Sequence, residues 1–353
     1  MKKKVSPEEC PATEPPGSNI LIPGSTKIEM PYGLLDLDPV VQADGPRIKC
    51  FIRGCNQYLL PPARGFRGEI CVTHGIRCHR SATFSYADPR RNVIIDGDLL
   101  TRIIKHPFKF ESHRLGLERS EDAVTLNVMR SLQEASCLNL VARFITGLDI
   151  VAEPTLYLWG LRLSDDTLTP WDLLIAARER FEHRLPIKRP KTEPDIGLHI
   201  PGVMVALLEA KFCSENPVTY PGQRRSPQSL TKEELLNIYS DLSLKIIDRQ
   251  KAAEADRLHG QLFRNMVFSE YMAQLDSPET QAYLCSLTRA GYEEDACEEF
   301  ARLIRPEFRD RFCHLTWEEI YTLSTLSWRR LSVLREYMLL KTANLVQAFQ
   351  LRI

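Results

Sequence analysis

Several features that would identify a common class of protein are missing from this chain of 353 residues. No apolar run approaches the roughly 18 residues that a membrane span needs, and no apolar stretch follows the basic N-terminus MKKKVSPEEC, so no secretory signal is apparent. Walker A, GxGxxG, HExxH and GxSxG motifs are absent. ATP-driven, dinucleotide-binding, zinc-protease and serine-hydrolase functions therefore lack their usual sequence support. We expect a cytoplasmic protein without a membrane partner.

The chain also lacks net charge, and it has too few cysteines for a disulfide scaffold. Lys and Arg number 46, as do Asp and Glu, so any nucleic-acid-binding surface must be local. Four of the ten cysteines fall between Cys50 and Cys78, which favours a reduced compartment with one metal site. The length suffices for one large domain or two to three small ones.

Composition divides the chain into four regions. Residues 1–45 are rich in Pro, Gly and charge, so we expect a flexible or extended N-terminal arm. Residues 46–92 form a compact basic Cys/His module, and residues 93–230 alternate helical and strand patterns. Residues 231–353 are helical in pattern almost throughout; this helical region could cover a sheet, form a homodimer or contact DNA.

An apolar stretch that ends in charged residues is the most informative part of the sequence. Residues 193–211 are EPDIGLHIPGVMVALLEAK, and the aliphatic residues from Val203 to Leu208 predict a buried strand. Glu209 and Lys211 are two residues apart, so a strand places both side chains on one face. A carboxylate and an ammonium at the end of a buried strand need partners or a bound ion.

Two acids and a lysine at a strand end suit the hydrolysis of a phosphodiester. That reaction needs a cation to neutralise charge, a positioned water and help for the leaving oxygen. Asp195 and Glu209 could bind Mg²⁺ or Mn²⁺, with the carbonyl of Ala210 as a further ligand. Lys211 could orient or deprotonate the attacking water and stabilise the developing charge. The alternative is an ordinary, solvated Glu–Lys pair.

A predicted helix upstream could bring a further acid to this strand end. Ser120 fits an N-cap, and Glu121 and Asp122 lie in the first turn, where acids suit the helix dipole. Either acid could add a carboxylate to the site. The apolar face of this helix is formed by Val124, Val128 and Leu132.

The turn before the strand poses a geometric problem. A strict two-residue turn at Pro201-Gly202 pairs residue 200 with residue 203, and therefore Asp195 with Leu208. Asp195 would then point to the face away from Glu209. The site thus requires a bulge, a longer turn or a bend near Asp195.

These residues resemble the PD-(D/E)XK nucleases, the restriction-endonuclease-like superfamily. The tripeptides EPD (193–195) and EAK (209–211) stand as its motif, and SEDAVTLNV (120–128) looks like the acid-bearing first helix of its core. HRLGLERSED and LYLWG look like a bacterial group of restriction-type endonucleases. The likeness covers roughly residues 46–320, of which only PD…EAK is a chemical motif. It implies a mixed sheet flanked by helices, Mg²⁺ dependence and phosphodiester hydrolysis.

One further position separates members of that family. Gln261, in QLFRN, looks like the glutamine that exonuclease-type members place after the motif, but their tyrosine four positions later is Asn265 here. This departure weakens an exonuclease assignment. A polar position on a helix surface is the simpler interpretation of Gln261.

Cysteine and histidine spacing predicts a zinc site in the basic module. Cys50 and Cys55 are followed, after fifteen residues, by Cys71 and His74. Zinc sites use four N/S ligands, usually as two close pairs separated by a loop, and four protein ligands leave no open position, so we expect structural Zn²⁺. The alternative is a set of unrelated buried cysteines. Alternate ligands for His74 are Cys78 and His79.

The same module is basic. From Arg47 to Arg91 nine Lys and Arg residues stand against Glu69 and Asp88, and five aromatic residues are interleaved. A basic zinc module beside a nuclease core suits contact with the phosphate backbone of duplex DNA. A solvated basic face on a structural arm is the alternative.

Together these patterns predict an α/β protein: a restriction-endonuclease-like mixed sheet flanked by helices, with a small N-terminal zinc module and a helical C-terminal region. The predicted function is metal-dependent endodeoxyribonuclease activity, in restriction or defence, carried by Asp195, Glu209, Lys211 and Glu121. Rival functions are a DNA-binding or scaffold protein without cleavage, an RNA-directed nuclease and a zinc-dependent regulator.

Overall fold

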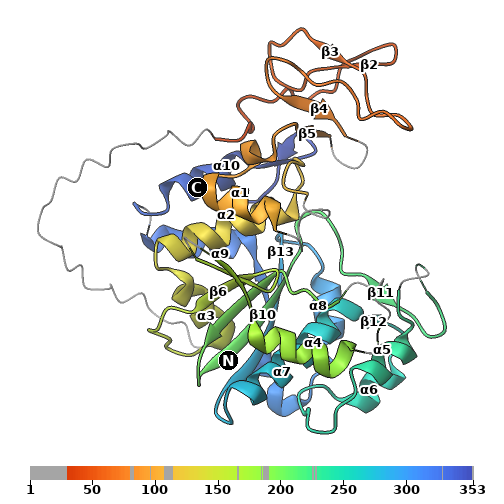
Figure 1. The fold of residues 1–353 in the computed structure, drawn as a ribbon, viewed down its shortest axis with the longest axis vertical. Helices are drawn as coiled ribbons and strands as arrows, with labels where there is room; N and C mark the ends of the chain where they lie inside the picture. Colours follow the sequence, from red (N-terminus) through yellow and green to blue (C-terminus); the bar gives the residue numbers. More distant parts are fainter. Residues whose placement is uncertain are drawn as a thin grey trace, which may run out of the picture.

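The computed structural model is a mixed α/β protein with a small Cys/His module set apart from the rest (Figure 1). Much of the predicted N-terminal arm, residues 1–29, lies outside the described residues. The structure describes residues 30–79, 83–95, 97–106, 114–164, 167–183, 185, 191–224, 226, 229–327 and 329–351.

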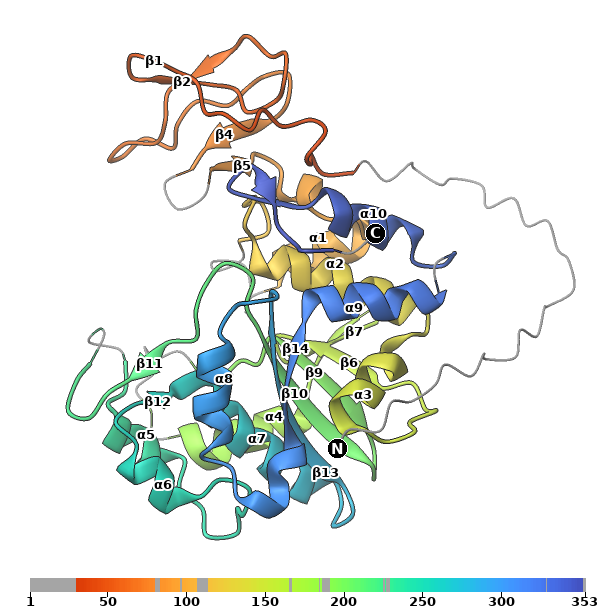
Figure 2. The same cartoon turned by 180° about the vertical axis from the view of Figure 1, so that it is seen from behind.

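A seven-stranded mixed sheet forms the centre of the molecule, in the order β14-β13-β10-β9-β6-β7-β8 (Figures 1 and 2). Strands β10, β13 and β14 run parallel to one another, and the remaining neighbours are antiparallel. The strands are β6 (Thr155–Leu158), β7 (Leu161–Leu163), β8 (Leu168–Pro170), β9 (Ile196–Ile200), β10 (Met204–Ala210), β13 (Gln281–Thr288) and β14 (Phe312–Thr316).

Helices cover both faces of this sheet, so its middle strands are buried on both sides. In β10, Met204, Ala206 and Leu208 join one apolar core while Val205 and Leu207 join the other. This explains the continuous apolar run of the strand. The first core contains residues of α1 (Gly97–Lys105), α2 (Glu121–Glu134), α3 (Leu138–Thr146), α9 (Trp317–Ser324) and α10 (Ser332–Leu340). The second contains residues of α4 (Asp172–Glu182), α5 (Lys232–Ile238), α6 (Arg249–Glu254), α7 (Gly260–Asp276) and α8 (Glu294–Ala301).

The expectation that the chain is helical almost throughout from residue 231 onward is wrong in part, since five strands accompany the helices α5 to α10 there. Strands β13 and β14 lie within this region and complete the central sheet beside β10. Residues 93–230 therefore do not form a core by themselves. A short apolar run such as that of β13 is buried on both faces, so it lacks the alternation that distinguishes a strand from a helix segment.

The Cys/His module begins before residue 46, so the segment from 30 to 45 is not a free arm. Leu37 is only 2% exposed and pairs with Ile52. Composition alone could not show this, because loop-rich β modules and extended arms are both rich in Pro and Gly. The module contains β1 (Ala43–Asp44), β2 (Arg47–Lys49), β3 (Tyr58–Leu59), β4 (Ile76–Cys78) and β5 (Phe84–Tyr86).

C-terminal residues complete the module. Leu345, beside the hairpin of β15 (Thr342–Ala343) and β16 (Val346–Gln347), belongs to the module's apolar core. The backbone of Leu34 donates to the carbonyl of Leu340 (3.2 Å). At Gly33 a Cβ atom would lie 2.5 Å from that carbonyl oxygen, so only glycine fits this contact.

Short elements connect these parts. They are the 3-10 helices Pro89–Asn92, Pro306–Arg311 and Thr325–Ser327, and the paired strands β11 (Val218–Thr219) and β12 (Leu258–His259). Within the described residues, no helix combines the length and the apolar composition needed to cross a membrane.

Candidate functional site

The turn between β9 and β10 places Asp195 and Glu209 on the same face of the sheet. Ile200 pairs with Met204, so the turn has three residues instead of two. The register continues to the pair Ile196–Leu208, and one step further brings Asp195 opposite Glu209. A two-residue turn would have reversed the face, because a slip of one residue turns every side chain over. The longer turn is thus the solution to the geometric problem that the sequence poses.

Asp195 is held at the start of β9 by backbone contacts on both sides. Its Oδ2 accepts the backbone N–H of Ala210 (2.9 Å), and its own carbonyl accepts the N–H of Trp159 (3.1 Å). The second carboxylate oxygen, Oδ1, has no hydrogen bond among the described residues. Asp195 therefore offers one oxygen to a ligand while the other fixes the side chain.

Glu209 and Lys211 form a buried ion pair at the end of β10. Their side chains are 2% and 6% exposed, and Lys211 Nζ lies 2.5 Å from Glu209 Oε1. The Nδ2 of Asn265, on α7, donates to Glu209 Oε2 (2.7 Å). The backbone of Lys211 is fixed as well, because its N–H donates to Leu287 O (2.7 Å) and its carbonyl accepts the indole N–H of Trp317 (3.1 Å).

Glu121 reaches the same place from the first turn of α2. The cap is as expected, since the Oγ of Ser120 accepts the N–H of Ala123 (2.9 Å). One oxygen of Glu121 accepts the N–H of Phe212 (2.8 Å) and the hydroxyl of Ser214 (2.9 Å). The other lies 3.7 Å from Lys211 Nζ.

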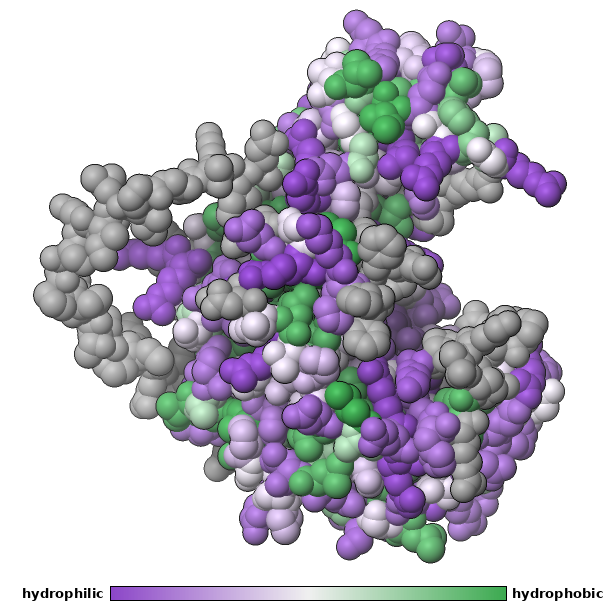
Figure 3. Space-filling model, in the orientation of Figure 1, coloured by the Kyte–Doolittle hydropathy of each residue, from purple (hydrophilic) through white to green (hydrophobic). Residues whose placement is uncertain are grey.

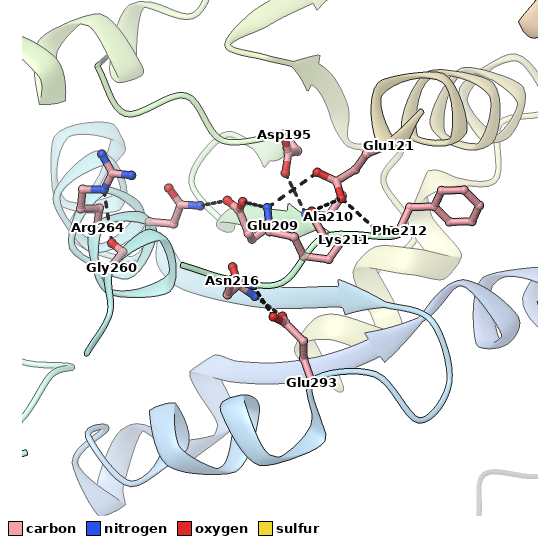
Figure 4. Close-up of polar contacts among 12 residues, drawn as sticks. Glu121, Asp195, Glu209, Ala210, Lys211, Phe212, Asn216, Gly260, Arg264 and Glu293 are labelled. Carbon is pink, nitrogen blue, oxygen red and sulfur yellow. Dashed lines mark hydrogen bonds and ion pairs between the residues drawn. The ribbon is translucent and has the colours of Figure 1, made fainter. Parts of the chain in front are cut away.

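Figure 4 shows Glu121, Asp195, Glu209 and Lys211 converging from three elements. We call these four residues the acidic site. Asp122, the other acid considered for it, accepts the backbone N–H of Arg114 (3.3 Å) instead. The structure therefore favours Glu121 as the acid that α2 contributes.

Three carboxylates surround one ammonium in the acidic site, and the pKa values reflect this imbalance. Burial, followed by the charge of Glu209, raises the pKa of Asp195 well above its ordinary range. Burial also raises the pKa of Glu121, against the attraction of Lys211. For Lys211, burial alone lowers the pKa, but the charges of Glu209, Asp195 and Glu121 outweigh it, so the net pKa is raised. The lysine is held as an ammonium, whereas the raised pKa values of Asp195 and Glu121 mean that these two carboxyl groups keep a proton more readily than in water.

The donor atoms of the acidic site suit a hard divalent cation. Asp195 Oδ1 is available, Glu209 supplies a second carboxylate, and the carbonyl of Ala210 belongs to the residue between Glu209 and Lys211. All of these are oxygens, which Mg²⁺ and Mn²⁺ prefer. The oxygens of the three carboxylates are not all within 4.8 Å of one another. Among the described residues, only the ligand atoms of the Cys/His group lie that close together. Water would have to complete the coordination of a cation here.

Helix α7 contributes Asn265 to the acidic site, whereas Gln261 lies elsewhere. Gln261 lines a cavity of about 390 Å³ with Tyr220, Arg264 and other residues at the start of α7. Arg264 itself turns back to the carbonyl of Gly260 (3.2 Å; Figure 4). Asn265 was noted in the sequence only as a departure from a tyrosine, and no pattern assigned it a contact. The contact joins residues 56 positions apart, so no local signal in the sequence could have found it.

Four residues of the module form a compact Cys/His group. The ligand atoms of Cys50, Cys55, Cys71 and His74 all lie within 4.8 Å of one another. Nδ1 of His74 is 3.3 Å from Cys71 Sγ and 3.5 Å from Cys50 Sγ, and the sulfurs of Cys55 and Cys71 are 3.9 Å apart. Three sulfurs and one imidazole nitrogen in a cluster of this size could bind a metal such as zinc.

The alternate ligands do not belong to this group. Cys78 is buried at the end of β4, in the module's apolar core, and is not among the four clustered donors. His79 lines a separate cavity at the base of the module. The pairing of Cys50 and Cys55 with Cys71 and His74 is the arrangement that the structure favours.

An open cavity of about 680 Å³ lies beside the acidic site. It is lined by residues that directly follow Lys211, among them Cys213, Ser214 and Asn216, and by Arg257. Ser214 also bonds Glu121, so one residue of the cavity wall contacts the acidic site. Figure 3 shows the molecular outline hollowed on this side, between the module above and the region of α5 to α8 below. A large substrate could therefore approach the acids from this side.

Comparison with known proteins found no matching family model, no matching curated protein and no matching solved structure.

Proposed function

We propose that the protein is a metal-dependent endodeoxyribonuclease that hydrolyses phosphodiester bonds of duplex DNA, in restriction or defence. The observation that carries this proposal is the register of the β9–β10 hairpin. It sets Asp195 opposite Glu209, with Lys211 on the same face two residues later. A structural ion pair needs only Glu209 and Lys211, whereas a third and a fourth charged side chain beside it, both partly buried, are expected of a site with a ligand.

The resemblance to the PD-(D/E)XK nucleases supports the same function. Its motif residues come together in space, and the sheet is mixed and flanked by helices, as that resemblance implies. The basic Cys/His module stands beside the open side of the acidic site and suits contact with phosphates.

The acidic site suggests a division of roles. Asp195 and Glu209, with the Ala210 carbonyl, would hold Mg²⁺ or Mn²⁺; such an ion, when bound, neutralises phosphate charge and polarises water. Lys211 would orient the attacking water and stabilise the developing negative charge, but as an ammonium it would not deprotonate that water. Glu121 would accept the proton, since its raised pKa makes it a better base and one of its oxygens faces Lys211.

Cleavage of supercoiled plasmid and linear duplex DNA tests the proposal. Wild type, Lys211→Ala and the surface control Lys251→Ala are compared with Mg²⁺, with Mn²⁺ and without added divalent ion, because a strong chelator would also remove zinc from the module. We expect metal-dependent cutting by wild type and the control, reduced at least about 100-fold in Lys211→Ala.

Two outcomes would contradict the proposal. Equal cutting by Lys211→Ala would place the activity outside the acidic site. DNA binding by wild type without cutting under any of these conditions would favour a binding or scaffold protein. The same preparation assayed on structured RNA separates the RNA-directed alternative.

A further inference from the structure

A cavity of about 640 Å³ lies at the junction between the module and the segment that leads to α2. Arg67 and Arg77 line it from the module, and Arg114 lines it from the segment 114–117. Ser85 and His79 add polar groups, and none of the lining residues that the structure describes is Asp or Glu. We call this cavity the junction pocket; the charged side chains among its described lining residues are all positive.

No counter-charge to the three arginines of the junction pocket is found among the described residues. Within the part of the chain that the structure describes, the guanidinium groups of Arg67, Arg77 and Arg114 make no ion pair and no hydrogen bond. The only two acids from Arg47 to Arg91 are paired elsewhere in the module: Glu69 with Arg47 (2.9 Å) and Asp88 with Arg90 (2.5 Å).

The positive charges act on a shared space. Burial lowers the pKa of His79, and the charges of Arg77, Arg114 and Arg119 lower it further. Like charges this close repel one another unless an anion lies between them. All three cations that line the pocket are arginine, whose planar group can donate two parallel hydrogen bonds to a phosphate.

Main-chain hydrogen bonds fix the two walls of the junction pocket relative to each other. The N–H of Tyr86, in β5, donates to the carbonyl of Gly116 (2.7 Å). The N–H of Glu118 donates to the carbonyl of Phe84 (3.2 Å), and Ser85 pairs with Leu117. Because the walls are pre-formed, an anion could bind without ordering a loop.

The position of the junction pocket relates it to the acidic site. The segment that carries Arg114 runs directly into the N-cap Ser120 and into Glu121. A short stretch of chain therefore joins the wall of the pocket to the acid that α2 contributes to the acidic site. A polymer of phosphates can occupy both places at once, whereas a small anion cannot.

We propose that the junction pocket binds a backbone phosphate of the duplex DNA that the acidic site cleaves. This inference rests on the proposed function, since it takes the same substrate. Arg67, Arg77 and Arg114 hold one phosphate through charge-assisted hydrogen bonds. Their contact joins the module to the catalytic part of the chain and sets where the duplex lies.

The test measures binding separately from cleavage. The affinity of Lys211→Ala for a fluorescent DNA duplex is measured by anisotropy at several salt concentrations, alone and combined with Arg77→Gln or Arg114→Gln. The matched control is Arg64→Gln, an exposed arginine of the module that does not line the pocket. We expect each pocket variant to weaken binding about tenfold and to lower the salt slope by about one. The control should change neither.

The other possible results of this binding experiment also test the inferred phosphate pocket. Unchanged affinity in both pocket variants overturns the inference, as does an equal loss in the control, which would indicate general charge. If Arg77→Gln does not fold, as judged by zinc content and circular dichroism, the exposed Arg114→Gln decides alone. If the pocket variants weaken DNA binding as expected but wild type never cuts DNA, the nuclease proposal is wrong and the inference of a phosphate-binding pocket is retained.

Discussion

Asn265 donates its side-chain amide to Glu209 Oε2 across 2.7 Å, from α7 to the end of β10. Both residues are 2% exposed, so this bond is made without competition from water. Glu209 thereby has one oxygen fixed by Asn265 and the other by Lys211. The two donors determine how Glu209 is presented within the acidic site.

Asn265→Ala should lower both stability and activity. It leaves a buried carboxylate oxygen without a donor, so we expect the free energy of unfolding to fall by about 1 to 3 kcal/mol. Under the proposed function, kcat for DNA cleavage falls while KM changes little, because Asn265 positions Glu209 and does not touch DNA. Urea denaturation and steady-state cleavage measure the two effects. Asn237→Ala, on the exposed surface of α5, is the control, and equal behaviour of the two variants would exclude a positioning role.

The acidic site should make the protein less stable as pH rises. The raised pKa of Asp195 means that, above its ordinary value of 3.8, the folded protein retains a proton that the unfolded chain has released. The free energy of unfolding therefore falls with increasing pH between these two pKa values, and Glu121 acts in the same direction.

Asp195→Asn should remove much of this pH dependence. Without added Mg²⁺, we expect the variant to be more stable than wild type at about pH 7 and to differ less at about pH 5. Urea denaturation at both pH values measures the difference. Asp256→Asn, at an exposed position, serves as control. A variant less stable than wild type at the higher pH would contradict the effect of burial on Asp195.

Zinc content should distinguish Cys71 from Cys78. Both side chains are buried, but only Cys71 belongs to the Cys/His group. We expect Cys71→Ser to lose the metal and Cys78→Ser to keep about one zinc per chain, as measured by a colorimetric chelator after unfolding. Equal loss in both variants would point to a different ligand set. If wild type contains no zinc, the four residues do not form a zinc site, and the alternative of unrelated buried cysteines is favoured.

The three-residue turn offers a test that depends on backbone conformation alone. Gly202 has φ +71°, and a Cβ added there meets nothing within 4 Å. Gly202→Ala should therefore cost about 1 to 2 kcal/mol through conformation only. Gly202→Asn should cost less, since asparagine tolerates the left-handed region. Urea denaturation compares the two, and equal stability of both variants with wild type would mean that the turn relaxes.

Local patterns predicted the residues of both candidate sites but not their surroundings. The spacing of Glu209 and Lys211, the cap at Ser120 and the Cys/His pairs depend on a few neighbouring positions, and the structure places these residues as expected. The two-residue turn at Pro201-Gly202 was the wrong starting point, because turn length is decided by pairing along the whole hairpin.

Long-range contacts account for what the sequence could not show. Asn265 meets Glu209 across 56 positions of the chain, and nothing near either residue indicates the contact. Strands β13 and β14 are parallel to β10 and buried between helices, so their apolar runs resemble helix segments. The place of residues 30–45 in the module likewise depends on pairs such as Leu37 with Ile52.

The apolar core of the module is completed by Leu345, a residue that the ribosome adds long after Leu37 and the Cys/His group. A nascent chain therefore carries the four clustered donors in a partly open module while the central sheet is still being made. Closure waits for Gly33 to meet Leu340 and for the hairpin of β15 and β16 to dock. The order of synthesis thus separates the two parts of the molecule, because every residue of the acidic site precedes the residue that completes the module's apolar core.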